Sequence, residues 1–136
     1  MIIQDKEVVI DLYGETYHCA LDVTMSYIGG KWKSVILWYL RNKTMRFSEL
    51  KKQIPDITEK MLSLQLKALE ESGLVRRKVY KEVPLRVEYS LTDFGKSLRP
   101  VVEMIAKWGR NLAENEGVFR TIEKEVVKTK KSSKNN

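Results

Sequence analysis

The pattern of apolar and polar residues predicts a series of short helices after residue 20, because apolar side chains recur three and four positions apart. The first predicted helices cover residues 23–28, 31–41, 47–54 and 58–72. Gly29 and Gly30 end the first helix, and Pro55 ends the third, since the residue before proline avoids helical backbone angles. The third and fourth helices therefore flank a short turn at residues 55–57.

Two of these helices carry an apolar face that we expect to be buried. In the second helix, the residues expected to face the core are Trp32, Val35, Ile36 and Tyr39. In the fourth helix, the residues expected to be buried are Leu62, Leu66 and Leu69. Thr58 is a good N-cap for the fourth helix and Gly73 a good terminator, so both of its ends are defined.

Alternating apolar and polar residues predict strands on both sides of the helices. Residues 75–81 and 86–91 alternate in this way and are rich in Lys and Arg, which predicts a basic β-hairpin. Residues 7–18 show a weaker alternation around Tyr13 and Gly14, which predicts a short hairpin or an N-terminal strand arm.

A last helical region follows Thr92, with apolar residues at near-heptad spacing. The stripe consists of Phe94, Leu98, Val101, Ile105, Trp108 and Leu112. Pro100 should kink or split it. The stripe is longer than one small core needs, so we expect a dimer; the alternative is a helix that packs back on its own chain. The expected interface residues are Val101, Ile105, Trp108 and Leu112.

Composition and charge narrow the class of protein. The 136 residues are 43% hydrophobic and 32% charged, which is typical of one folded domain. There are 25 Lys and Arg against 18 Asp and Glu, giving a formal charge of +7. Residues 41–99 hold fourteen basic and eight acidic residues and so carry six of these seven charges. This basic central segment favours binding to the phosphate backbone of a nucleic acid.

The sequence offers little for catalysis or metal binding. One cysteine, Cys19, excludes an intramolecular disulfide, and His18 is the lone histidine, so we expect no metal, no cofactor and no enzyme activity. No segment approaches the roughly 20 apolar residues of a membrane-spanning helix, and the first eleven residues lack a secretory core. We therefore expect a cytoplasmic protein without membrane attachment.

The predicted order of helix, helix, turn, helix and basic hairpin is that of a winged helix-turn-helix, a mostly helical α+β fold that binds double-stranded DNA. The expected domains are an arm at 1–18, the winged domain with its dimerisation helices at 19–115, and an extension at 116–136 that is disordered at its end. The alternative is a winged-helix module that binds protein instead of a specific DNA sequence.

Candidate DNA contacts come from the outward face of the fourth helix and from the hairpin. The expected DNA contacts of this recognition helix are Thr58, Lys60, Met61, Ser63, Leu64, Gln65 and Lys67. The expected backbone and wing contacts are Arg46, Lys52, Arg76, Arg77, Lys78, Lys81 and Arg86. Arg86, beside the hairpin turn, is the best candidate for a narrow minor groove. The alternatives are an ordinary solvated helix face and charges that protect an edge strand.

Several motifs resemble the HxlR-type branch of the MarR-like regulators. They include Ile28-Gly-Gly-Lys-Trp32, Arg46-Phe-Ser-Glu-Leu50, Gly73-Leu74-Val75 and Arg86-Val-Glu-Tyr-Ser-Leu-Thr92, within a resemblance that covers residues 19–113. The resemblance implies a dimeric bacterial transcriptional regulator, often of redox or electrophile responses. It places the recognition face on residues 58–67 and the wing on 78–86. Leu64 stands where a polar residue is more usual, and the arm before Cys19 is longer than typical.

Cys19 is similar in position to the sensing cysteine of some members of that family. It precedes the first helix, whose dipole would favour a thiolate. The alternative is a small, buried hydrophobic residue without a sensing role. Together these features predict a homodimer that binds a near-palindromic operator and responds to an effector that the sequence does not identify.

Overall fold

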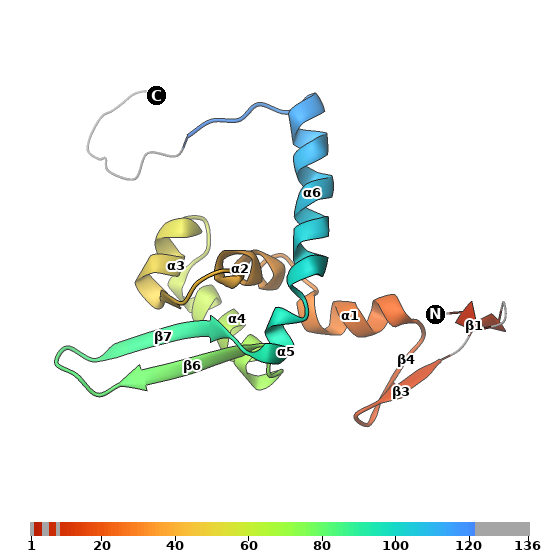
Figure 1. Cartoon of the computed structure of the whole chain (residues 1–136), viewed down its shortest axis with the longest axis horizontal. Helices are drawn as coiled ribbons and strands as arrows, with labels where there is room; N and C mark the ends of the chain where they lie inside the picture. The colour runs from red at the N-terminus through yellow and green to blue at the C-terminus, as the bar shows by residue number, and fades with distance from the viewer. Residues whose placement is uncertain (1, 4–5, 8, 122–136) are drawn as a thin grey trace. The chain divides into compact units, whose positions relative to one another are not determined.

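The computed structural model describes residues 2–3, 6–7 and 9–121 of the chain (Figure 1). Its helices are α1 (Ala20–Ile28), α2 (Lys33–Leu40), α3 (Phe47–Gln53), α4 (Glu59–Glu71), α5 (Asp93–Lys96) and α6 (Arg99–Glu116). Its strands are β1 (Ile2–Ile3), β2 (Lys6–Glu7), β3 (Ile10–Leu12), β4 (Glu15–Tyr17), β5 (Met45–Arg46), β6 (Val75–Tyr80) and β7 (Arg86–Leu91). This confirms the mostly helical α+β class. The expected disorder at residues 128–136 lies outside the described residues.

The chain forms two units, Met1–Arg99 and Pro100–Asn136. In the first unit, β5, β7 and β6 form an antiparallel sheet in that order. The long β6–β7 hairpin is the predicted basic hairpin, and Figure 1 shows its tip extending beyond α3. Strand β5 was not predicted, because two residues are too short to show an alternating pattern. It pairs Met45 with Tyr89.

The core of the first unit lies between the helices and one face of this sheet. Leu62, Leu66 and Leu69 of α4 are buried, as predicted from their spacing. For α2 the prediction was right for Ile36, but it missed Leu37 and Leu40. Its fully buried residues are Ile36, Leu37 and Leu40, whereas Trp32, Val35 and Tyr39 are only half-buried. α2 is apolar on nearly every side, so the periodicity could not select one face; packing against α4 and β7 does.

Helix α4 begins and ends where its sequence predicts. The Thr58 hydroxyl accepts a hydrogen bond from the Met61 backbone N–H at 3.0 Å, which satisfies one of the free donors of the first turn. At the other end Gly73 has a φ of +85°, a conformation that favours glycine. The N–H of Gly73 donates to Glu70 and that of Leu74 donates to Leu69, both at 3.0 Å, which closes a Schellman motif.

The two remaining predicted features are also present. Tyr13 and Gly14 form the left-handed turn between β3 and β4, so the arm is a hairpin. The last helical region is split just before Pro100, into α5 and α6. Thr92 caps α5 by accepting a hydrogen bond from the Gly95 N–H at 3.0 Å.

Candidate DNA-binding surface

Helix α4 presents a polar outward face with one exposed leucine. The helix packs its leucines against α2 and β6, and this fixes the direction of the opposite face. That face exposes Lys60, Ser63, Leu64 and Lys67, with Thr58 exposed at its start. Met61 and Gln65 are half-buried at its borders, where the Gln65 amide lies 3.3 Å from the Met61 sulfur. Leu64 is 57% exposed, so its apolar surface is available to a partner.

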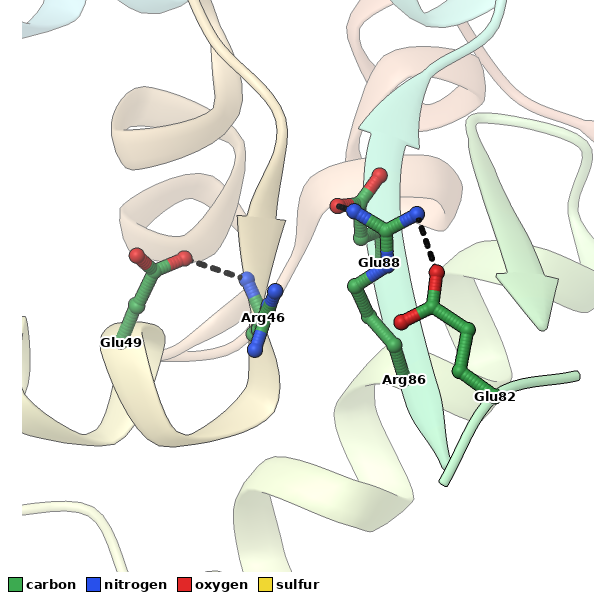
Figure 2. A network of polar contacts seen from close by, with 5 residues as sticks. All are labelled: Arg46, Glu49, Glu82, Arg86 and Glu88. Carbon is green, nitrogen blue, oxygen red and sulfur yellow. Dashed lines mark hydrogen bonds and ion pairs between the residues drawn. The ribbon is translucent and has the colours of Figure 1, made fainter. Parts of the chain in front are cut away.

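Arg86 does not extend freely from the wing. Its guanidinium lies between two carboxylates, 3.0 Å from Glu82 and 3.3 Å from Glu88, as Figure 2 shows. The same group stacks on the Tyr80 ring at 3.8 Å, and the side chain is only 28% exposed. Arg86 therefore braces the base of the wing turn. The sequence placed Arg86 beside the turn, but these three partners were not identified from it.

The other wing cations are exposed. The structure exposes Arg76, Arg77, Lys78 and Lys81. Arg76 and Lys78 share the outer sheet face with Arg86, because their cross-strand partners are Ser90 and Glu88. Lys78 also lies over the Tyr80 ring, with its Nζ 4.9 Å from the ring centre. The connection at the tip exposes two apolar residues, Val83 and Leu85, which the sequence analysis did not single out.

Arg46 and Lys52 belong to a neighbouring part of the same unit. Arg46 is exposed at the junction of β5 and α3, and Lys52 is exposed on α3. A carboxylate oxygen of Glu49 accepts a hydrogen bond from the Arg46 backbone N–H at 2.8 Å (Figure 2). This bond fixes the start of α3 and with it the place where the Arg46 side chain emerges.

Cys19 lies at the N-cap of α1. It is a free, half-buried thiol with extended backbone angles, and its side chain makes no capping hydrogen bond. The neighbouring His18 backbone N–H donates to Asp22 at 3.3 Å. Within the described residues, no group of three or more His, Cys, Asp or Glu side chains could hold a metal ion. None of the described helices is long and apolar enough to span a bilayer.

Helix α6 exposes an apolar face. Its exposed large apolar residues are Val101, Met104, Ile105, Trp108 and Leu112. They lie on one side of the helix because they are spaced three and four residues apart. Met104 was not among the residues predicted for an interface, although it borders the same stripe. Trp108, the largest of them, is 71% exposed.

Comparison with known proteins agrees with this architecture. The family model of the HxlR-like helix-turn-helix matches residues 27–117. YkvN, an uncharacterised HTH-type transcriptional regulator of Bacillus subtilis (strain 168), is 50% identical over 100 residues, which are 74% of this chain and 85% of YkvN. The redox regulator HypR in its oxidised form is a similar solved structure, with a TM-score of 0.67 and 44% identity over 68% of this chain and 96% of HypR.

HypR in its reduced form is similar as well, with a TM-score of 0.68 and 41% identity over 71% of this chain and 96% of that one. The matched family region contains α4, the wing and α6. The resemblance seen in the sequence motifs is thereby confirmed. This chain belongs to the HxlR-like helix-turn-helix family and is a transcriptional regulator with a helix-turn-helix DNA-binding fold.

Proposed function

We propose that this protein is a homodimeric regulator that acts in the cytoplasm, where α4 reads a specific near-palindromic DNA sequence and the wing binds the flanking backbone. The observation that carries this proposal is the outward face of α4. This face exposes hydrogen-bond donors together with Leu64, while the buried leucines on the opposite side hold the helix in place. A helix of this kind fits the major groove by its width.

The chemistry of the exposed face suits base recognition. Lys60 can donate to guanine acceptors, and Ser63 can donate or accept. Leu64 provides the apolar surface that a thymine methyl group contacts. Gln65 and Met61 at the border can complete the contact, and Lys67 and Thr58 can reach the backbone at either end.

The wing and α3 supply positioning contacts. Arg77, Lys78 and Lys81 are the exposed wing cations that we assign to phosphates, with Arg76 nearer the base of the hairpin. Arg86 acts by holding the wing in shape through Glu82 and Glu88. Arg46 and Lys52 extend the basic surface from the side of α3. Such contacts contribute affinity without sequence preference.

The dimer follows from α6. A folded soluble protein rarely leaves a stripe of large apolar side chains in water, and a second copy of α6 would cover Val101, Ile105, Trp108 and Leu112. A two-fold dimer presents two α4 helices, which suits half-sites about one turn of DNA apart.

A second function, redox sensing by Cys19, is favoured by its place at the N-cap of α1. Cys19 is a free thiol there, and HypR, a similar protein, is a redox regulator. Two Cys19 thiols would lose two protons and two electrons to an oxidant such as a hydroperoxide and form a disulfide between chains. The change at the start of α1 would then alter the spacing of the two α4 helices.

Gel-shift titration over a salt series tests the main proposal. The probe is the DNA upstream of the protein's own gene, and the control is a shuffled sequence of equal length. We expect tighter binding to the upstream DNA and a linear fall of log K with log salt, with a slope of about −0.9 per phosphate contact. Binding that ignores both salt and sequence would instead favour a winged-helix module that binds protein.

A further inference from the structure

A pocket of about 520 Å³ opens in the first unit, at the C-terminal end of α4. Its lining residues are Tyr13, Tyr17, Ser26, Tyr27, Glu71, Ser72 and Phe94. They come from the β3–β4 arm, α1, the last turn of α4 and α5. The volume is within the roughly 300–1,000 Å³ typical of small-molecule sites. Tyr13 and Tyr17 precede the region that the family model matches, so the arm contributes two lining residues from outside that region.

The lining has the chemistry of a site for an organic cation. It consists mainly of aromatic rings, of which Tyr27 and Phe94 lie edge to face at 5.6 Å. Aromatic faces attract cations through their quadrupole. Glu71 supplies a carboxylate, and neither Lys nor Arg is among these described lining residues. Although the chain has a formal charge of +7, the only charged side chain among the lining residues that the structure describes is the carboxylate of Glu71, which attracts a positively charged ligand.

The end of α4 strengthens that attraction. The last turn of this helix contains no basic residue, and it carries Glu71 at the negative end of the helix dipole. A carboxylate at this end of a helix is locally unfavourable. A bound cation would relieve the repulsion, so Glu71 gains more from a cationic ligand than it would elsewhere on the surface.

The pocket is also connected to the DNA-reading helix. Glu71 and Ser72 belong to the end of α4, and Phe94 follows Thr92 by two residues. The Thr92 hydroxyl donates to the carbonyl groups of Gly73 and Leu74, which ties α5 to the residues just after α4. A ligand held between Phe94 and Glu71 therefore contacts the residues that fix the position of α4, the helix that we assign to base recognition.

We propose that this pocket binds a small organic cation with aromatic or alkyl groups, and that this ligand is an effector of the regulator. The effector role rests on the proposed DNA-binding function, whereas cation binding does not. Tyr13, Tyr17, Tyr27 and Phe94 surround the ligand, and Glu71 pairs with its charge. Tyr13 is 86% exposed, so most of its ring surface is free to contact a ligand.

Isothermal titration of the full-length protein without DNA tests cation binding directly. The probe is tetraphenylphosphonium, and tetraphenylborate serves as a control of equal shape and opposite charge. We expect saturable binding of the phosphonium with clear preference over the borate. Glu71→Gln should weaken phosphonium binding about tenfold, and Tyr13→Ala about threefold. The matched control is Glu70→Gln, since Glu70 is an exposed neighbour outside the lining and its loss should change nothing.

Equal phosphonium affinity in wild type and Glu71→Gln, equal affinity for both probes, or no saturable binding would each overturn the cation site. Circular dichroism melts of each variant confirm that the fold is retained. Gel shifts with and without the phosphonium then test the effector role: wild type should change its DNA affinity and Glu71→Gln should not. Phosphonium binding that leaves DNA affinity unchanged would overturn the effector role alone, and a protein that never binds specific DNA would overturn the proposed function instead.

Discussion

Helices α4 and α6 place their apolar residues in opposite environments. In α4 the leucines at positions 62, 66 and 69 are completely covered by the same chain, and the exposed face is polar apart from Leu64. In α6 Val102 is buried, but most of the large apolar residues are exposed, with Ile105 51% and Trp108 71% accessible. Both helices are amphipathic, so periodicity alone does not distinguish them.

The difference indicates what each helix presents to a partner. The apolar side of α4 is already satisfied within the chain, so its free surface is the hydrogen-bonding face that we assign to DNA. The free surface of α6 is apolar, which suits a second copy of the same helix. Substitutions on the free surface of α4 should therefore affect DNA binding, whereas substitutions on the free surface of α6 should affect dimer formation.

The largest effect is expected from the double variant Val101→Asp, Ile105→Asp. In a symmetric dimer both chains place two carboxylates in the apolar contact, which should weaken association by about 5 kcal/mol or more. Light scattering at micromolar concentration should give a monomer mass, with retained helicity and lost specific DNA binding. Lys107→Asp, Arg110→Asp is the control on the opposite side of α6 and should keep the dimer mass. A double variant that stays dimeric and binds DNA normally would refute the α6 interface.

The next effect separates two leucines of one helix. Leu66→Ala should lower the free energy of unfolding by about 3 kcal/mol, because it leaves a cavity beneath α4. Leu64→Ala should change it by less than about 0.5 kcal/mol, since that side chain is mostly in water. Urea denaturation of both variants measures the difference. Similar losses in the two proteins would show that Leu64 is not a free surface residue.

A smaller effect distinguishes reading from positioning. Ser63→Ala or Gln65→Ala should change base preference by about 1–3 kcal/mol at particular positions, because in the proposed complex the lost group contacts bases. Lys78→Ala should weaken binding to all sequences alike and reduce the salt slope by about 0.9, because it removes one of the proposed phosphate contacts. Selection from random DNA followed by salt titration measures both. An unchanged selected motif for every α4 variant would mean that the reading face lies elsewhere.

The smallest effect concerns Cys19 under reducing conditions, where Cys19→Ser should bind DNA as the wild type does. After treatment with a hydroperoxide or a quinone, only the wild type should lose or gain DNA affinity, since only it has a thiol to modify. Non-reducing electrophoresis should show a disulfide-linked dimer of the wild type. The same response in both proteins would exclude Cys19 as the sensor.

Much of α4 could be predicted because the information is local. Thr58, Gly73 and the leucine spacing specify a helix by interactions within one or two turns, and the structure confirms all of them. The buried face of α2 could not be predicted in the same way. Its sequence is apolar almost all round, so contacts with distant elements decide which residues face inward.

The sequence by itself determined the order of helices and wing strands, the ends of α4, the outward position of Leu64 and the apolar stripe of α6. These depend on backbone preferences and on periodicity, which act over a few residues. Tertiary structure alone decided the pairing of β5 with β7, the capture of Arg86 between Glu82 and Glu88, and the aromatic pocket at the end of α4. Strand pairing and the pocket join segments distant along the chain, and the Arg86 contacts depend on the path of the wing turn, so no short-range pattern encodes them.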